Sequence, residues 1–313
     1  MRFLKNFMIK IAKIKKLITH DGSFHSDDIF AAATLSILLE KKGETFEIIR
    51  TRDPEIIKTG DYVFDVGGIY DAETNRFDHH QIGGAGKNVS FVGEPGIEYS
   101  SFGLVWKKFG LEVCGSQKVA DIINKKLVSP IDAHDNGMDL VENKYDVTPY
   151  HIQHFFSSMN LTWREENVSN DEMFLESVEI AKKILWREII QIKDALLAEE
   201  KIVSIYQSTT DKRIIVLDDT YPYEHVLNNF SEPLFIIYPR KTNNAWGVKA
   251  IRGDLKSFKN KKDLPGSWGG LKDQELQKVS GVKDAVFCHR ALFMAVAKSK
   301  EGAIKLAQIA VES

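Results

Sequence analysis

The chain has 313 residues, enough for about two domains of ordinary size. Its 42 basic and 44 acidic residues nearly cancel and 43% of its residues are apolar, a composition that excludes a disordered chain and a disulfide-stapled mini-protein. The two cysteines, Cys114 and Cys288, lie far apart and need no oxidising compartment. No run approaches the roughly 20 apolar residues that span a bilayer. We therefore expect a cytoplasmic protein with no membrane contact.

Residues 1–16 form a basic extension in which six Lys or Arg side chains precede the first acid, Asp21. Such a segment can be a targeting signal or can lie on a membrane surface. It lacks the Ser and Arg content of a transit peptide. We treat it as an extension of the first domain.

The first half of the chain alternates short apolar runs with helical patterns, which is typical of βαβ units and a mainly parallel sheet. The predicted strands are 17–19, 46–50, 62–64 and 76–77, and the predicted helices are 27–39, 100–109 and 117–127.

Apolar residues recur at spacings of three and four between 171 and 198, which predicts a long amphipathic helix. We expect this helix to connect an N-terminal domain, 1–170, to a C-terminal domain, 199–313. The predicted elements of the second domain are strands at 202–206, 213–217, 233–238 and 246–251 and a final helix from about 301. The expected fold class is α/β: a mainly parallel sheet with flanking helices, followed by a C-terminal α+β domain that closes over the first and positions substrate.

Potential metal ligands follow most of the early strands. Five of the nine histidines lie before residue 135, each within two positions of an aspartate. Ligands bind at the carboxyl ends of strands in open α/β sheets. The groups at these ends, or in the loop after the first strand, are His20, His25, Asp27, Asp65, Asp78, His79 and His80.

Imidazole and carboxylate without thiolate suit Mn²⁺, Co²⁺, Fe²⁺ or Zn²⁺ better than a purely oxygen-liking Mg²⁺ site. So many ligands exceed the need of one ion. They suit two ions about 3.5 to 4 Å apart, which activate a water and stabilise the leaving oxygen of a phosphoryl group.

Simpler interpretations exist for each group taken alone. A single pair such as His134-Asp135 is usually a surface hydrogen bond, and Asp27 and Asp28 suit the first turn of any helix. The run from Asp78 to His80 is stronger evidence, because three polar groups after an apolar strand make a poor core. Together, four converging segments indicate metal binding.

Eight stretches resemble the DHH phosphoesterase superfamily and, more closely, the melanocyte-proliferating-gene (MYG-type) family of metal-dependent hydrolases. They are 19–28, 50–53, 65–71, 77–81, 100–106, 131–137, 264–271 and 287–289, and the resemblance covers about 17–312. It implies a DHH-like first domain and two divalent ions, with Mn²⁺ expected first and Co²⁺, Zn²⁺, Fe²⁺ or Mg²⁺ as alternatives.

The resemblance also implies roles for individual residues. One ion is expected on His20, His25 and Asp65, and a second on Asp27, Asp65, His79 and either Asp132 or Asp135. Asp65 would bridge the two ions, and His80 would contact the scissile phosphate or act as an acid, with Asp78 and Asp28 in the same catalytic group. The wider superfamily usually has Asp where this chain has His25, so the metal's identity stays open.

The resemblance further implies a 3′→5′ exonuclease acting on single-stranded RNA or short oligonucleotides. Residues 239–263 contain eight basic residues and two acids, with Trp246 and Phe258 between them, and this basic segment suits a single-strand binder as well as a solvated loop. The expected substrate contacts are Arg50, Arg52, Lys87, Lys107, Ser100, Ser101, Trp268, Gly269, Gly270 and His289.

Two alternatives stay open: a small-molecule phosphohydrolase acting on pyrophosphate or a dinucleotide, and a metal-stabilised binding protein without catalysis. A homo-oligomer is compatible with either.

Overall fold

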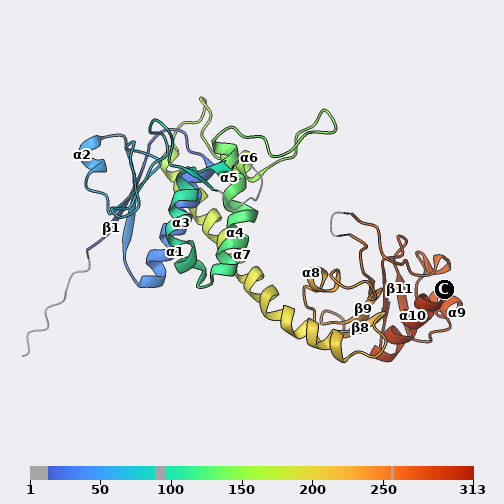
Figure 1. The fold of residues 1–313 in the computed structure, drawn as a ribbon. Helices are drawn as coiled ribbons and strands as arrows, with labels where there is room; N and C mark the ends of the chain where they lie inside the picture. Colours follow the sequence, from blue (N-terminus) through green and yellow to red (C-terminus); the bar gives the residue numbers. More distant parts are fainter. Residues whose placement is uncertain (1–12, 89–95, 255–256) are drawn as a thin grey trace, which may run out of the picture. The chain divides into compact units, whose positions relative to one another are not determined.

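A computed structural model describes residues 13–88, 96–254 and 257–313. Most of the predicted basic extension, residues 1–12, lies outside this range. The chain forms two compact units, Met1–Ile192 and Lys193–Ser313, and the boundary between them falls within one long helix (Figure 1). No helix among the described residues is long and apolar enough to cross a membrane.

The first unit, unit 1, is built on a five-stranded sheet of order β2-β1-β3-β5-β4. Its strands are β1 (Lys15–Thr19), β2 (Phe46–Arg50), β3 (Tyr62–Phe64), β4 (Tyr70–Asp71) and β5 (Arg76–Phe77). All pairs are parallel except β4 with β5, which confirms the predicted mainly parallel sheet. The parallel arrangement brings the ends of β1, β3 and β5 to one edge.

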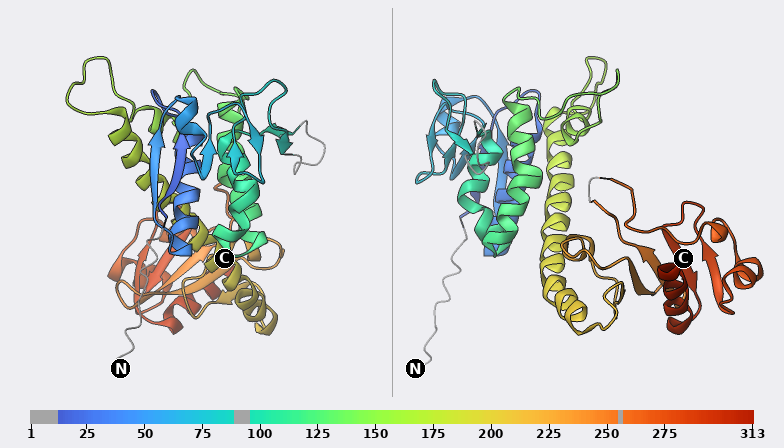
Figure 2. Two further views of the ribbon diagram at one scale, coloured as in Figure 1. Left: turned by 90° about the vertical axis from the view of Figure 1, so that its left-hand side faces the viewer. Right: turned by 45° about the vertical axis from the view of Figure 1, so that its right-hand side comes forward.

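Helix α1 (Ser26–Lys42) is buried on nearly every side, as its continuous apolar sequence predicts. It packs against α3 (Ser101–Cys114) (Figure 2). The Phe30 and Phe102 rings stack between the two helices, with their centroids 5.3 Å apart. The remaining elements of unit 1 are α2 (Pro54–Ile57), β6 (Lys87–Asn88), β7 (Ile97–Glu98), α4 (Gln117–Ile123), a π-helical turn (Asn124–Val128), α5 (Ser129–Asp135) and α6 (Ile152–Ser157). The predicted helices are therefore confirmed, with shifted ends.

The predicted amphipathic helix is longer than the sequence suggested. Helix α7 runs over Asn170–Ser208, so the predicted strand at 202–206 is wrong. Ala198, Ile202 and Tyr206 continue the four-residue spacing and are buried together in unit 2. The helical period thus outweighs the β-branched residues between them.

The second unit, unit 2, has a five-stranded sheet of order β11-β12-β10-β9-β8. Only β8 and β9 pair in parallel, which confirms the predicted α+β class. Its elements are β8 (Ile214–Val216), α8 (Glu224–Leu227), β9 (Phe235–Arg240), β10 (Ala245–Ala250), a 3₁₀ turn (Gly266–Trp268), α9 (Asp273–Ser280), β11 (Ala285–Cys288), β12 (Met294–Ala297) and α10 (Lys300–Glu312).

Candidate metal centre

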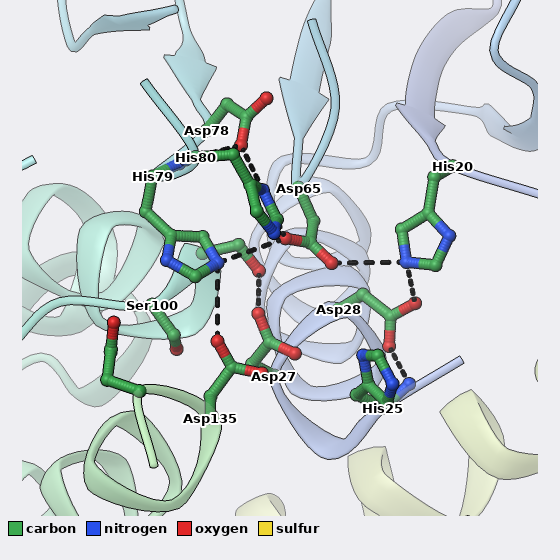
Figure 3. A network of polar contacts seen from close by, with 12 residues as sticks. His20, His25, Asp27, Asp28, Asp65, Asp78, His79, His80, Ser100 and Asp135 are labelled. Carbon is green, nitrogen blue, oxygen red and sulfur yellow. Dashed lines mark hydrogen bonds and ion pairs between the residues drawn. The ribbon is translucent and has the colours of Figure 1, made fainter. Parts of the chain in front are cut away.

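Strand ends and helix ends of unit 1 bring a dense polar group together (Figure 3). His20 follows β1, Asp65 follows β3, and Asp78, His79 and His80 follow β5. The first turn of α1 supplies Asp27 and Asp28, its N-cap is His25, and the end of α5 supplies Asp135.

Asp65 lies in the middle of this group. Its Oδ2 is 3.2 Å from Nε2 of His20 and its Oδ1 is 3.3 Å from Nε2 of His79. Burial raises the pKa of the Asp65 carboxyl, but the two imidazoles outweigh burial and hold that pKa well below its usual range. The backbone of Asp65 has φ of 55°, a left-handed conformation rarely adopted outside glycine. The carboxylate is thus fixed between two potential ligands.

The two acids of α1 face different partners. Asp28 accepts a hydrogen bond from the backbone N–H of His25 at 3.0 Å, which caps the helix, and its other oxygen is 3.3 Å from Nε2 of His20. Asp27 accepts a hydrogen bond from the Ser101 hydroxyl at 2.8 Å. Burial raises the pKa of Asp28 to about 7, against the lowering effect of His20.

Asp132 and Asp135 have different surroundings, although they lie one helical turn apart. Asp135 Oδ2 is 3.2 Å from Nε2 of His79. Asp132 Oδ1 accepts the backbone N–H groups of Ser100 and Gly103 at 3.2 and 3.0 Å and the Ser100 hydroxyl at 2.6 Å. Asp135 therefore faces the imidazole of His79, whereas Asp132 anchors the start of α3.

Asp78 is almost fully occupied by hydrogen bonds. Its Oδ2 accepts the backbone N–H of Gly68 at 2.5 Å, and its Oδ1 accepts that of His79 at 2.7 Å and Nδ1–H of His80 at 2.8 Å. The His80 side chain is 64% exposed. Asp78 therefore orients the loop and the His80 ring, and leaves His80 Nε2 available.

Among the described residues, three groups of three side chains could hold a metal ion, because within each group one possible ligand atom per residue lies within 4.8 Å of the others. They are His20, Asp28 and Asp65; Asp65, His79 and His80; and His25, Asp27 and Asp135. Buried carboxylate oxygens lie in the same region: among the described residues Asp27 Oδ1 and Asp132 Oδ2 have no hydrogen-bond partner, and Asp28 Oδ2 and Asp65 Oδ1 have only the imidazoles of His20 and His79, each at 3.3 Å.

An unpartnered buried carboxylate oxygen is costly, and a bound cation removes that cost. The imidazoles respond to the same negative field. Burial lowers the pKa of His20, but Asp28 and Asp65 outweigh it and raise the pKa to about 10. Burial lowers the pKa of His79 in the same way, and Asp65 with other carboxylates raises it to about 9. The donors present fit divalent cations.

A cavity of about 700 Å³ opens on this group. His20, His25, Asp65 and His80 line it together with Arg52, whose Nε lies 3.3 Å from Asp21.

The other expected substrate contacts of unit 1 are not part of that lining. The buried guanidinium of Arg50 donates to Asp171 and to the Gly22 carbonyl, both at 2.7 Å, and lies over the Phe174 ring. Ser100 and Ser101 are buried and use their hydroxyls on Asp132 and Asp27. Lys87 pairs with Glu98 at 3.1 Å, and Lys107 lies over the Tyr99 ring.

The expected contacts in unit 2 divide between core and surface. Trp268 is 2% exposed and belongs to the core of that unit. Gly270 adopts φ of 81° and donates to the Cys288 carbonyl at 3.1 Å, and Gly269 follows the 3₁₀ turn. His289 is half-buried against the Phe293 ring at 4.5 Å.

Asn160 is a positioning residue that sequence reasoning missed. Its amide oxygen accepts the backbone N–H of Phe24 and its amide nitrogen donates to the Phe24 carbonyl, both at 2.9 Å. This pair of bonds fixes the loop between His20 and His25. No motif marks Asn160, because the contact spans 136 residues of sequence.

Unit 1 is thus an α/β domain in which imidazoles and carboxylates gather at the carboxyl edge of a mainly parallel sheet. This arrangement is that of a candidate metal-binding α/β protein. A family profile, MYG1_exonuc, described as an uncharacterised protein family (UPF0160), matches residues 16–311. The chain belongs to this family, which confirms the MYG-type resemblance of its sequence.

Similar proteins are found across animals. The chain is 31% identical to the MYG1 protein C27H6.8 of Caenorhabditis elegans, covering 94% of each chain. It is 28% identical to the MYG1 exonuclease of Homo sapiens, covering 96% of this chain and 86% of that protein.

Among solved structures, RecJ from Thermus thermophilus in complex with Mn²⁺ matches with a TM-score of 0.29 and 12% identity. The match covers 96% of this chain and about half, 52%, of that one.

Proposed function

We propose that this protein is a metal-dependent phosphodiester hydrolase, and more narrowly a 3′→5′ exonuclease that acts on single-stranded RNA or short oligonucleotides. The observation that carries the proposal is Asp65, a buried carboxylate held between the imidazoles of His20 and His79 and open to a cavity. Relatives that match 93–96% of the chain carry the name exonuclease, which supports the same reaction class here.

In this proposal two divalent ions would be held by Asp65 together with His20 and Asp28 and with His79 and Asp135, and His25 and Asp27 would complete the ligand set. Mn²⁺ is the ion we propose first, because imidazole and carboxylate donors occur together. When bound, such a pair of ions supplies an activated water and offsets negative charge on the phosphate oxygens.

The chain's own residues then handle the proton and the substrate. His80 Nδ1–H is bound to Asp78, so His80 Nε2 can carry a proton to the leaving oxygen, and the Asp78 carboxylate stabilises the imidazolium before transfer. Arg52, at the cavity lining, offers its guanidinium to a phosphate oxygen. Ser101 and Asn160 position Asp27 and the loop before α1.

In this proposal residues 199–313, which lie within unit 2, form the substrate-binding domain, with 171–198 as the connector and 1–170 as the catalytic domain. Its basic segment, residues 239–263, and His289 are the contacts we propose for the oligonucleotide. We also propose a cytoplasmic location, since a chain with two cysteines needs no oxidising compartment.

The test uses the full chain with RNA, DNA, dinucleotide and pyrophosphate substrates in Mn²⁺, Mg²⁺, Co²⁺ or Zn²⁺. We expect metal-dependent cleavage of RNA, with 5′-labelled RNA shortening stepwise and 3′-labelled RNA releasing its label at once as mononucleotide. The variant Asp65→Asn should lose at least about 1,000-fold in rate, in line with the loss of a metal ligand's charge. Asp61→Asn is the matched control, because Asp61 lies at the opposite end of β3.

Other outcomes select the alternatives. Turnover of pyrophosphate or dinucleotides without RNA cleavage points to a small-molecule phosphohydrolase. Metal-dependent stabilisation without cleavage of any substrate points to a binding protein and contradicts the proposed catalysis.

A further inference from the structure

Four aromatic side chains gather where α5 and α6 meet. They are His134 in the last turn of α5, Tyr150 and His151 just before α6, and His154 in its first turn. The centroid of the His154 ring lies 6.2 Å from that of His134, 5.7 Å from that of His151 and 5.5 Å from that of Tyr150. We name these four residues the ring cluster.

The ring cluster begins next to the candidate metal centre. His134 directly precedes Asp135, whose Oδ2 lies 3.2 Å from His79. Helix α6 is fixed to the elements that carry the candidate ligands: the Phe156 ring packs edge-on against Phe30 of α1 at 5.6 Å, and Gln153 donates to the Pro130 carbonyl of α5 at 3.2 Å. Helix α6, which carries His154, is therefore held in place relative to Asp135 and to α1.

A reciprocal cap also fixes two of the rings themselves. The backbone N–H of His151 donates to Nδ1 of His154 at 3.1 Å, and the His151 side chain accepts the backbone N–H of His154. Tyr150 is 70% exposed and His134 is exposed, while both capping histidines are half-buried. Rings that are rigid before binding lose little entropy when a ligand stacks on them.

The ring cluster is not explained by the metal centre. None of its four residues belongs to a group of described side chains that could hold a metal ion. Among the described residues no lysine or arginine lies over the Tyr150 ring, and none of the four residues is itself a lysine or arginine, so the cluster offers ring faces rather than fixed positive charge. Ring faces suit planar, uncharged groups, and nucleobases are the groups of that kind that lie beside a scissile phosphodiester.

We propose that the ring cluster stacks on a nucleobase of the substrate and so holds that nucleotide beside the metal centre. This inference rests on the proposed function, because it takes the substrate to be an oligonucleotide. Base–aromatic stacking tolerates every base, so the ring cluster contributes affinity without sequence preference.

The test removes two rings and keeps the helix cap. The double variant His151→Ser/His154→Gln replaces His-x-x-His by Ser-x-x-Gln, the standard capping box, and a thermal melt checks that the fold is retained. We compare an RNA oligonucleotide with a ribose-phosphate oligomer of the same length that lacks bases. We expect KM for the RNA to rise about 5- to 100-fold, the loss typical of one stacked base, with kcat and all constants for the abasic oligomer unchanged. Tyr145 is an exposed aromatic residue of the same loop outside the ring cluster, so Tyr145→Ala should leave KM and kcat unchanged for both substrates.

Equal losses on both substrates overturn the proposal, because the rings then act on the backbone or on the metal centre. Unchanged KM for RNA overturns it as well. If the parent protein cleaves neither RNA nor the abasic oligomer, the proposed function fails, and the ring cluster is tested separately by fluorescence anisotropy of labelled RNA in Mn²⁺. There the double variant should weaken binding about 5- to 100-fold relative to the parent, and equal affinity contradicts the stacking role.

Discussion

The candidate metal centre of unit 1 and the basic segment of unit 2 differ in how far contacts within the protein satisfy their charged groups. In the centre, Asp27 Oδ1 has no hydrogen-bond partner among the described residues, and Asp28 Oδ2 and Asp65 Oδ1 have only imidazoles at 3.3 Å. In the basic segment, most lysines already contact protein acceptors. The carboxylates of the centre keep buried negative charge that a cation would offset, whereas protein acceptors already satisfy most of the lysines of the basic segment.

The contacts of the basic segment are specific. Lys241 lies 2.8 Å from Asp219 and Lys249 lies 3.3 Å from Glu224. Lys261 and Lys262 donate to the backbone carbonyls of Phe230 and Val311 at 2.5 and 2.7 Å. A count of basic residues in the sequence therefore overstates the positive charge available to a nucleic acid.

The largest expected effect is that of metal removal. Chelation should abolish turnover, and restoring Mn²⁺ at about 100 times its Kd should stabilise the fold by about 2.7 kcal/mol. The thermal shift is measured with and without Mn²⁺ in the parent and in Asp65→Asn. If saturating Mn²⁺ does not change the melting temperature of the parent protein, the buried carboxylates of the centre do not bind this ion, and the contrast with the basic segment is contradicted.

The second effect concerns Asp78, which contacts the loop and His80. We expect Asp78→Asn to lower activity or metal affinity by about 10- to 100-fold, because the amide cannot accept from Gly68 and His80 on both atoms. Steady-state kinetics and a Mn²⁺ titration measure the two quantities. If Asp78 acts through His80, the double variant Asp78→Asn/His80→Gln should be no slower than His80→Gln alone. Additive losses give Asp78 a separate role.

The third effect tests the anchoring of Asp132. A Cβ atom at Gly103 would lie 2.1 Å from Asp132 Oδ2, so Gly103→Ala must displace a buried carboxylate. We expect it to lower the free energy of unfolding by about 1 to 3 kcal/mol. Denaturant unfolding measures the change, and Gly266→Ala is the control, because a Cβ there meets open space. A fully stable Gly103→Ala protein would show that Asp132 is not needed to hold α3.

Much of the candidate site could be predicted from sequence because its signal is local. The apolar strands 46–50 and 62–64 have the predicted bounds, and a parallel sheet places the polar residues that follow them at one edge. His20, Asp65 and His79 each follow such a strand, so their approach needed no knowledge of side-chain contacts.

The rest depends on contacts that sequence does not encode locally. Arginine is a residue type that often binds phosphate, yet the Arg50 guanidinium is buried against Phe174 and Asp171, which lie more than 120 residues later in the sequence. Asp132 and Asp135 are equivalent in sequence, and only the approach of Ser100 and Gly103 to Asp132 separates them. Trp268 is a residue type that often stacks on bases, but here it packs in the hydrophobic core of unit 2.

The smallest expected effect separates satisfied from available charge within the basic segment. The Arg252 guanidinium lies 4.7 Å from the centroid of the Phe258 ring, which is 87% exposed, and Arg252 itself is half-buried. We expect Arg252→Gln to weaken RNA binding about threefold and to reduce the slope of log affinity against log salt by about 0.7, the value for one phosphate contact with a single strand. Lys262→Gln should leave the slope unchanged, because its ammonium is bound to the Val311 carbonyl. Anisotropy titrations at several salt concentrations measure both slopes. Equal slopes for the two variants would show that Lys262 exchanges the Val311 carbonyl for a phosphate when RNA binds. The basic segment would then differ less from the metal centre than its contacts suggest.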